Sequence, residues 1–324
     1  MTPEGQAHAD GARPARARAV LVTGGKWAFL AAAVALVVWK LASQWDDVSP
    51  ALGQVGWGAL AAATLAACVA LGFNTLSWRA VMRAVGLEAP LGDAAAVFLI
   101  SQPGKYVPGA VWPVMAQAEF AREHGVSRAR ALTGSLVAMV VGVATAGIVG
   151  AVGLAAAAPG SLADYWWALA IAAALVVLLT PPVLGRVVAL ALRVTRRGDQ
   201  AVRIGGRALG ESAAWSVLNW LALGLQAWLV LRPLAGASAS TVALATGAFA
   251  LSWLVGFLLV IAPAGIGPRE AALVLTLASV ASAPQALAVA VLSRAAMTVA
   301  DLVGLAVGLV LRAARRRAAA AGVA

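Results

Sequence analysis

The stretch SQPGKYVPGAVWP, residues 101–113, puts prolines, glycines and Lys105 into a chain that is strongly apolar elsewhere. A second stretch, IAPAGIGPREAALVL at 261–275, has the same features, and in each stretch two prolines stand five residues apart. Unpaired backbone groups in hydrocarbon cost several kcal/mol each, so interrupted helices in a membrane must line protein or a water-filled cavity. The two breaks therefore decide how the chain folds.

Composition places the chain in a membrane. Of its 324 residues 62% are hydrophobic and 11% are charged, whereas soluble domains carry about 25% charged residues. Apolar runs near the ~20 residues that cross a bilayer recur along the chain. We predict an all-α polytopic membrane protein with a basic tail at 1–25, a membrane domain at 26–312 and a short C-terminal tail at 313–324. About six full spans are predicted, at 27–45, 55–78, 130–155, 163–181, 211–231 and 285–311.

Metal and disulfide chemistry are not expected. Cys68 is the single cysteine, and His8 and His124 have no ligand-like neighbours at suitable spacing. We therefore predict no metal and no cofactor. The net charge is +11, and its basic residues lie mainly in the segments that connect the spans, where they indicate membrane topology. No nucleic-acid partner is therefore expected.

Basic residues mark one side of the membrane. Nineteen of the 24 Lys and Arg residues fall in the N-terminal tail with Lys26, 79–83, 119–130, 186–207 and 312–317. Because positive loops stay cytoplasmic, we predict a plasma-membrane protein with both termini inside. Residues 91–118 then begin and end on the cytoplasmic side, and 241–282 begin and end on the opposite side. Each is predicted to be a re-entrant helical hairpin.

The unit of span, hairpin and span thus occurs twice, at 55–155 and 211–311, in opposite orientations. Inverted repeats with Gly/Pro-interrupted segments indicate a transporter-like site. Pro108 and Pro268 are expected at the first positions of the returning half-helices. Helix N-termini carry partial positive charge and bind anions, so with Lys105 and Arg269 they would hold an anionic group. The alternative is two simple kinks, with Lys105 reaching the interface.

Further polar residues in the spans suggest contacts between the second hairpin and the last span. Intramembrane charges are usually functional, and we expect Arg269 or Arg294 to pair with Glu270 or Asp301, as a clamp or as a gate. Tyr106 and Trp112 are candidates for contacting a headgroup, although Trp112 could also serve packing. Close helix approach is expected at Gly142, Gly147, Gly150, Gly153, Gly304 and Gly308.

SQPGKYVPGAVWPV with the following REHGVSRAR, and FLLVIAPAGIGPREAALVL later, resemble the two signature regions of the lysylphosphatidylglycerol synthase transmembrane family, a flippase-like module. The resemblance covers roughly residues 25–312. It implies that the module moves a lipid between leaflets. We expect the soluble aminoacyl-transferase domain of full-length synthases to be absent from this chain. The family's motif positions carry over to Gly104, Lys105, Pro108, Gly109, Pro263, Gly265, Gly267, Arg269 and Glu270.

Taken together, the sequence predicts a non-enzymatic lipid translocase. It would move an anionic phospholipid or polyprenyl phosphate by alternating access. A second hypothesis is an accessory or scaffold subunit for a separately encoded synthase or envelope enzyme. Less favoured are a polyprenyl-linked glycosyltransferase and a small-solute transporter. The expected outer loops contain only Asp46, Asp47 and Asp164 as carboxylates, which disfavours glycosyl transfer.

Overall fold

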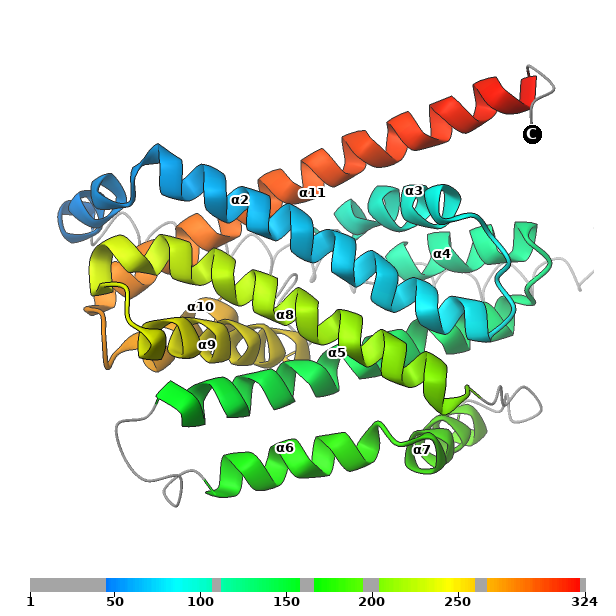
Figure 1. Cartoon of the computed structure of the whole chain (residues 1–324), viewed down its shortest axis with the longest axis horizontal. Coiled ribbons are helices and arrows are strands. Elements are labelled where there is room, and N and C mark those ends of the chain that lie inside the picture. Colours follow the sequence, from blue (N-terminus) through cyan, green and yellow to red (C-terminus); the bar gives the residue numbers. More distant parts are fainter. Residues whose placement is uncertain (1–44, 107–111, 158–165, 195–203, 260–266, 321–324) are drawn as a thin grey trace, which may run out of the picture.

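The computed structural model describes residues 45–106, 112–157, 166–194, 204–259 and 267–320, and these residues form helices joined by short turns. Figure 1 shows them as a layered bundle of long and short helices. The elements in chain order are α2 (Trp45–Ala84), α3 (Leu91–Ser101), η1 (Gln102–Tyr106), α4 (Trp112–Glu123), α5 (Arg128–Ala157), α6 (Trp166–Leu178), α7 (Pro181–Val194), α8 (Gly206–Ala235), α9 (Ala239–Leu258), α10 (Pro268–Leu277) and α11 (Ala283–Ala320).

Five of these helices are long and apolar enough to cross a membrane, which confirms the predicted all-α, multi-pass class. Four of them, α2, α5, α8 and α11, contain the predicted spans 55–78, 130–155, 211–231 and 285–311. The predicted span 27–45 lies outside the described residues except for Trp45, as do the tail 1–25 and the end of the C-terminal tail. Helix α11 continues past the predicted domain boundary at 312 to Ala320.

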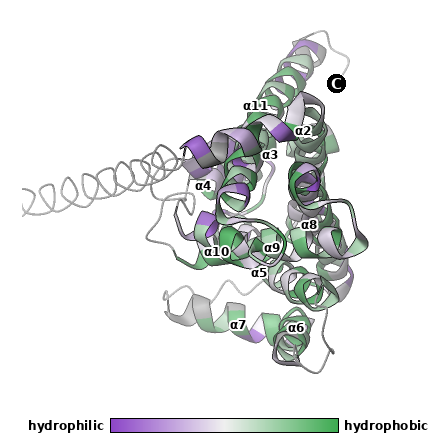
Figure 2. Cartoon of the chain, turned by 90° about the vertical axis from the view of Figure 1, so that its left-hand side faces the viewer, coloured by the Kyte–Doolittle hydropathy of each residue, from purple (hydrophilic) through white to green (hydrophobic). Residues whose placement is uncertain are grey.

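The outer surface suits a lipid environment. Large apolar side chains are freely exposed on the helices, among them Trp57 at 86%, Leu275 at 76% and Leu302 at 58%. Figure 2 shows hydrophobic residues over much of the length of the helices. Exposed apolar surface of this extent would promote aggregation in water, and in a bilayer it faces hydrocarbon.

The predicted full span at 163–181 is not one continuous helix in the described residues. Helix α6 ends at Leu178, and the chain bends by 80° before α7. The cause is the pair Pro181 and Pro182, because proline lacks an amide hydrogen and its ring clashes with the preceding turn. Only the two helices together are counted as a sixth candidate span.

The first predicted hairpin corresponds to α3 and α4. Their 11 and 12 residues give lengths of roughly 16 and 18 Å, short of the ~30 Å hydrocarbon core. The two helices pack on each other. In Figure 1 α3 starts near the end of α2, and α4 leads into α5 at that same end of the bundle. The pair therefore enters and leaves the bundle at one end, as the charge distribution predicted.

The second hairpin, α9 and α10, differs in one respect. Helix α9 has 20 residues, or about 30 Å, so it is long enough to span by itself, whereas α10 has 10 residues. The two helices pack together, and Figure 1 shows α9 starting, and the chain entering α11, at the end of the bundle opposite to α3 and α4.

Helix packing follows a two-fold pattern. Contacts within the set α2, α3, α4 and α5 have counterparts within the set α8, α9, α10 and α11. The packing of α2 on α3 corresponds to that of α8 on α9, the packing of α4 on α5 to that of α10 on α11, and the packing of α2 on α5 to that of α8 on α11. The contacts between the two sets follow the same rule, because α3 packs on α11 as α9 packs on α5. Helices α2 and α8 lie against each other and run in opposite directions in Figure 1. This arrangement supports the predicted inverted repeats.

Glycines allow the closest helix approaches. A Cβ on Gly247 of α9 would lie 2.6 Å from the backbone nitrogen of Leu154 and 2.9 Å from the carbonyl carbon of Gly153. On α11, a Cβ added to Gly308 would lie 3.0 Å from the carbonyl oxygen of Ala96. The predicted close approach is confirmed at Gly147, Gly150, Gly153, Gly304 and Gly308, but it is wrong for Gly142, which has nothing within 4 Å of the added atom and instead lines a cavity.

Candidate functional site

A cavity of about 260 Å³ lies between the two sets of helices. A single water needs about 10–15 Å³ on this measure, so the space is large enough for a lipid headgroup. The wall includes residues of α2, α3, α4 and α5 and of α8, α9 and α11, together with η1. The cavity therefore sits where the two sets meet, which is where inverted-repeat transporters bind their substrates.

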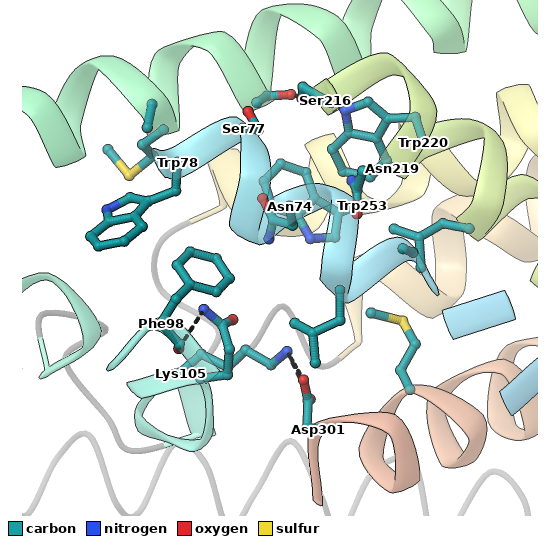
Figure 3. Close-up of a pocket in the computed structure, with 18 of the residues that line it drawn as sticks. Asn74, Ser77, Trp78, Phe98, Lys105, Ser216, Asn219, Trp220, Trp253 and Asp301 are labelled. Carbon is teal, nitrogen blue, oxygen red and sulfur yellow. Dashed lines mark hydrogen bonds and ion pairs between the residues drawn. The ribbon is translucent and has the colours of Figure 1, made fainter. Parts of the chain in front are cut away.

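One end of the cavity is charged. Asp301 of α11 is 4% exposed, and its two carboxylate oxygens lie 2.8 and 2.7 Å from the Nζ atom of Lys105 in η1. The hydroxyl of Tyr106 donates to Asp301 Oδ2 at 2.5 Å. The first helix break is thus tied to the last span by an ion pair and a hydrogen bond. Figure 3 shows Lys105 and Asp301 pointing at each other at one side of the cavity.

A second ion pair ties the other hairpin to the same helix. Arg294 of α11 pairs with Glu270 of α10, and Arg294 and Asp301 are seven residues apart, on one face of α11. Pro268 occupies the first turn of α10, and Gly267 is its N-cap with φ +95°. The second carboxylate oxygen of Glu270 accepts from the Gly267 amide at 2.6 Å. Glu270 therefore both caps α10 and joins it to α11.

Arg269 is the surplus cation of this region. Among the described residues its guanidinium has no carboxylate partner; it lies 4.8 Å from the ring of Phe249 and contacts the sulfur of Met297 at 3.2 Å. Met297 also lines the cavity. Three cations and two carboxylates gather around this part of α11, with a formal surplus of one positive charge: Lys105, Arg269 and Arg294 against Glu270 and Asp301.

The opposite end of the cavity is neutral and aromatic. Trp220 of α8 and Trp253 of α9 lie beside Asn219 and Asn74 in Figure 3, whereas Trp78 of α2 lies apart from them, near Phe98. The Trp220 indole nitrogen donates to Thr145 Oγ1 at 3.1 Å and to the Gly142 carbonyl at 3.2 Å, which fixes the ring. The ring of Trp253 meets that of Trp220 edge-on at 4.9 Å.

A family model of the lysylphosphatidylglycerol synthase TM region matches residues 25–314. The chain belongs to this family. The match covers every helix that the structure describes except the last residues of α11. Comparison with curated proteins gave no match. The family assignment confirms the resemblance read from the two interrupted stretches and places the chain among membrane modules related to lipid handling.

The residues of this synthase-family module that the sequence singled out separate into three groups. Lys105 and Tyr106 meet Asp301 at the charged end of the cavity, next to Gly104 in η1. Glu270 and Arg294 form one of the ion pairs expected between the second hairpin and the last span. Pro108, Gly109, Pro263 and Gly265 lie outside the described residues, and Trp112 begins α4 with its side chain undescribed.

Two features of the cavity were not predicted. The sequence suggested Asp301 only as a partner for Arg269 or Arg294, and the structure pairs it with Lys105, 196 positions earlier. Asn74 and Asn219, at the neutral end, were not among the predicted site residues. The available signal was that both asparagines lie in corresponding spans of the two repeats.

Proposed function

We propose that this membrane module moves an anionic lipid between leaflets by alternating access. The observation that carries the proposal is the cavity between the two helix sets, with a helix break and an ion pair at one end. Family membership supports a role in lipid handling. Under this proposal the protein works in the plasma membrane, its termini are cytoplasmic and it performs no covalent chemistry on the lipid.

The Lys105–Asp301 pair suggests how an anionic headgroup is admitted. Separating a buried pair costs about 3–5 kcal/mol when one partner is left uncompensated. A headgroup phosphate that replaces the Asp301 carboxylate gives Lys105 a new anionic partner, so that only Asp301 is left without a cation. The surplus charge of Arg269, beside Met297 on the cavity wall, adds attraction for the phosphate. Asp301 and Tyr106 retain their hydrogen bond during this exchange.

Movement of the site would follow from the attachment of both hairpins to α11. The Lys105–Asp301 pair holds η1, and the Glu270–Arg294 pair holds α10. When the phosphate takes Lys105, the first hairpin is released while the second stays attached. The cavity can then open toward a different leaflet, as in repeats that rock about a central site.

The test is lipid translocation in proteoliposomes. Reconstituted wild-type protein is expected to move a fluorescent anionic phospholipid between leaflets, and Lys105→Ala and Arg269→Ala are expected to insert normally and lose this activity. Arg83→Ala is the matched control, because Arg83 is exposed in the last turn of α2 and does not line the cavity. Unchanged translocation in both cavity variants would refute the proposal. A wild-type protein that moves no anionic phospholipid or polyprenyl phosphate would refute it as well, and would favour an accessory subunit.

A further inference from the structure

We infer that a second, smaller cavity is a binding site for a single halide ion, which in the cell is chloride. The cavity has a volume of about 10 Å³, lies where α9, α10 and α11 meet, and shares no lining residue with the large cavity. Its wall combines the charged residues Arg269, Glu270 and Arg294 with Ser293 and three apolar side chains. The inference goes beyond the proposed function, because it concerns an inorganic anion at a different place in the bundle.

The size of the small cavity restricts its occupant to one small particle. A single water needs about 10–15 Å³ on the same measure, so the space suits one water or one atomic ion, and a phosphate, sulfate or carboxylate group is too large for it. The apolar part of the wall is closed to the outside, since Phe249, Leu273 and Ala290 are 1%, 3% and 5% exposed. An occupant is therefore held among protein atoms, where electrostatic attraction is stronger than in water.

Charge decides between an anion and a water. Glu270 and Arg294 compensate each other as an ion pair. Arg269 has no carboxylate partner among the described residues, and it contacts only the sulfur of Met297 and the ring of Phe249 there. Two arginines against one carboxylate leave the cavity wall with a formal surplus of one positive charge. An uncompensated cation inside a membrane bundle is costly, and a monovalent anion removes this cost whereas a water does not.

Ser293 supplies an independent observation. This residue is 2% exposed and lines the small cavity, and its hydroxyl has no hydrogen-bond partner in the described part of the chain. By contrast, the buried hydroxyl of Ser252 on α9 donates to the Phe249 carbonyl at 2.9 Å. Buried polar groups in proteins are nearly always hydrogen-bonded. The Ser293 hydroxyl is thus available to donate to a halide, and hydrogen bonds to a charged acceptor are the strong ones.

A bound halide would also affect the large cavity. Met297 contacts Arg269 and lines the large cavity, so the charge of Arg269 acts on both cavities. Two anions that share one surplus cation weaken each other's binding, and this coupling is reciprocal. A halide beside Arg269 and a lipid phosphate beside Lys105 would therefore oppose each other. This consequence rests on the proposed function, whereas the halide site itself does not.

The experiment measures chloride binding to the purified full-length chain in a non-ionic detergent. The protein is exchanged into a gluconate buffer, and radioactive chloride is added in equilibrium dialysis at constant ionic strength. We expect saturable binding of about one chloride per chain, as the volume of the cavity allows. Unlabelled bromide should displace the chloride, and sulfate should not. Absence of saturable binding would overturn the inference and assign the cavity to a water, and displacement by sulfate as effective as by bromide would overturn it as well.

Variants assign the binding to the small cavity. Ser293→Ala and Arg269→Gln are each expected to weaken chloride binding by at least about tenfold. The matched controls are Ser252→Ala, which removes a buried hydroxyl outside the cavity wall, and Arg83→Gln at an exposed arginine, and both should leave chloride binding unchanged. Ser293→Ala carries the test if Arg269→Gln does not fold, because the hydroxyl has no partner to lose among the described residues. Undiminished chloride binding in Ser293→Ala would overturn the inference.

Short-chain phosphatidic acid separates this inference from the proposed function. Added to the wild-type protein, it is expected to weaken chloride binding by at least about fivefold, the lower end of ordinary coupling between two sites. Chloride binding that the lipid leaves unchanged would refute the use of Arg269 for the lipid phosphate and leave the halide site in place. Lipid movement by a chain that binds no chloride would refute only the halide site.

Discussion

Replacing both members of the Lys105–Asp301 pair should be less damaging than replacing Lys105 alone. In Lys105→Met the Asp301 carboxylate keeps its hydrogen bond from Tyr106 but loses its cation, in a side chain that is 6% exposed. In the double variant with Asp301→Asn the site is neutral, and the asparagine oxygen can still accept from Tyr106. The second substitution therefore relieves a desolvated, unpaired charge.

The magnitude follows from the exposure of the two partners. Removing one member of a fully buried pair costs about 3–5 kcal/mol, whereas exposed pairs contribute about 0.2–1 kcal/mol. The Lys105 side chain is 34% exposed, so the pair lies between these limits. We expect a coupling free energy of about 1–3 kcal/mol between positions 105 and 301.

Unfolding in mixed micelles measures this coupling. The wild type, both single variants and the double variant are titrated with denaturing detergent, and unfolding is followed by the fluorescence of the 12 tryptophans. Distant residues add within about 0.3–0.5 kcal/mol. A coupling below about 0.5 kcal/mol, or a double variant less stable than Lys105→Met, would show that the pair does not hold the first hairpin to α11.

Three further predictions concern the framework around the site. Glu270→Ala should reduce stability more than Glu270→Gln in the same titration, because glutamine keeps an acceptor for the Gly267 amide. A helix cap contributes about 0.5–2 kcal/mol. Equal losses of stability in the two variants would contradict the capping role. Gly247→Ala should destabilise the protein by about 1–3 kcal/mol, because the added Cβ meets backbone atoms of α5. Gly210→Ala, with open space around it, should be neutral or stabilise by up to about 1 kcal/mol. Destabilisation by both substitutions would refute the packing argument. Cysteines placed at the exposed positions 88 and 127, in a chain without Cys68, should both be labelled by an impermeant reagent from the same side of the membrane, and labelling from opposite sides would remove the first hairpin.

The helix breaks were predictable because their causes are local. A proline constrains its own backbone and removes its own amide hydrogen wherever it lies, so Pro268 marks the first turn of α10 without any tertiary information. The same local effect explains the bend before α7, where the predicted span 163–181 ended at the first of the two prolines Pro181 and Pro182. Apolar run length was equally informative, since it depends only on the thickness of the bilayer.

The length of α9 shows where local rules stop. The break near Pro263 was predicted, and the described helix ends at Leu258 before it. Whether a 20-residue helix crosses the bundle or stops within it depends on its neighbours. Gly247 against Gly153 and Gly224 against Thr246 allow α9 to lie deep between α5 and α8, and these contacts join residues from distant parts of the chain.

Composition, basic loops and paired prolines by themselves determined a polytopic helical membrane protein with two interrupted segments of opposite orientation. These properties arise from each residue's own hydrophobicity, charge and backbone geometry. The tertiary structure alone decided that Lys105 meets Asp301 and that Asn74 and Asn219 line one cavity. Such pairings join helices far apart in the sequence, and they form only when long-range packing brings polar groups together that hydrocarbon cannot solvate.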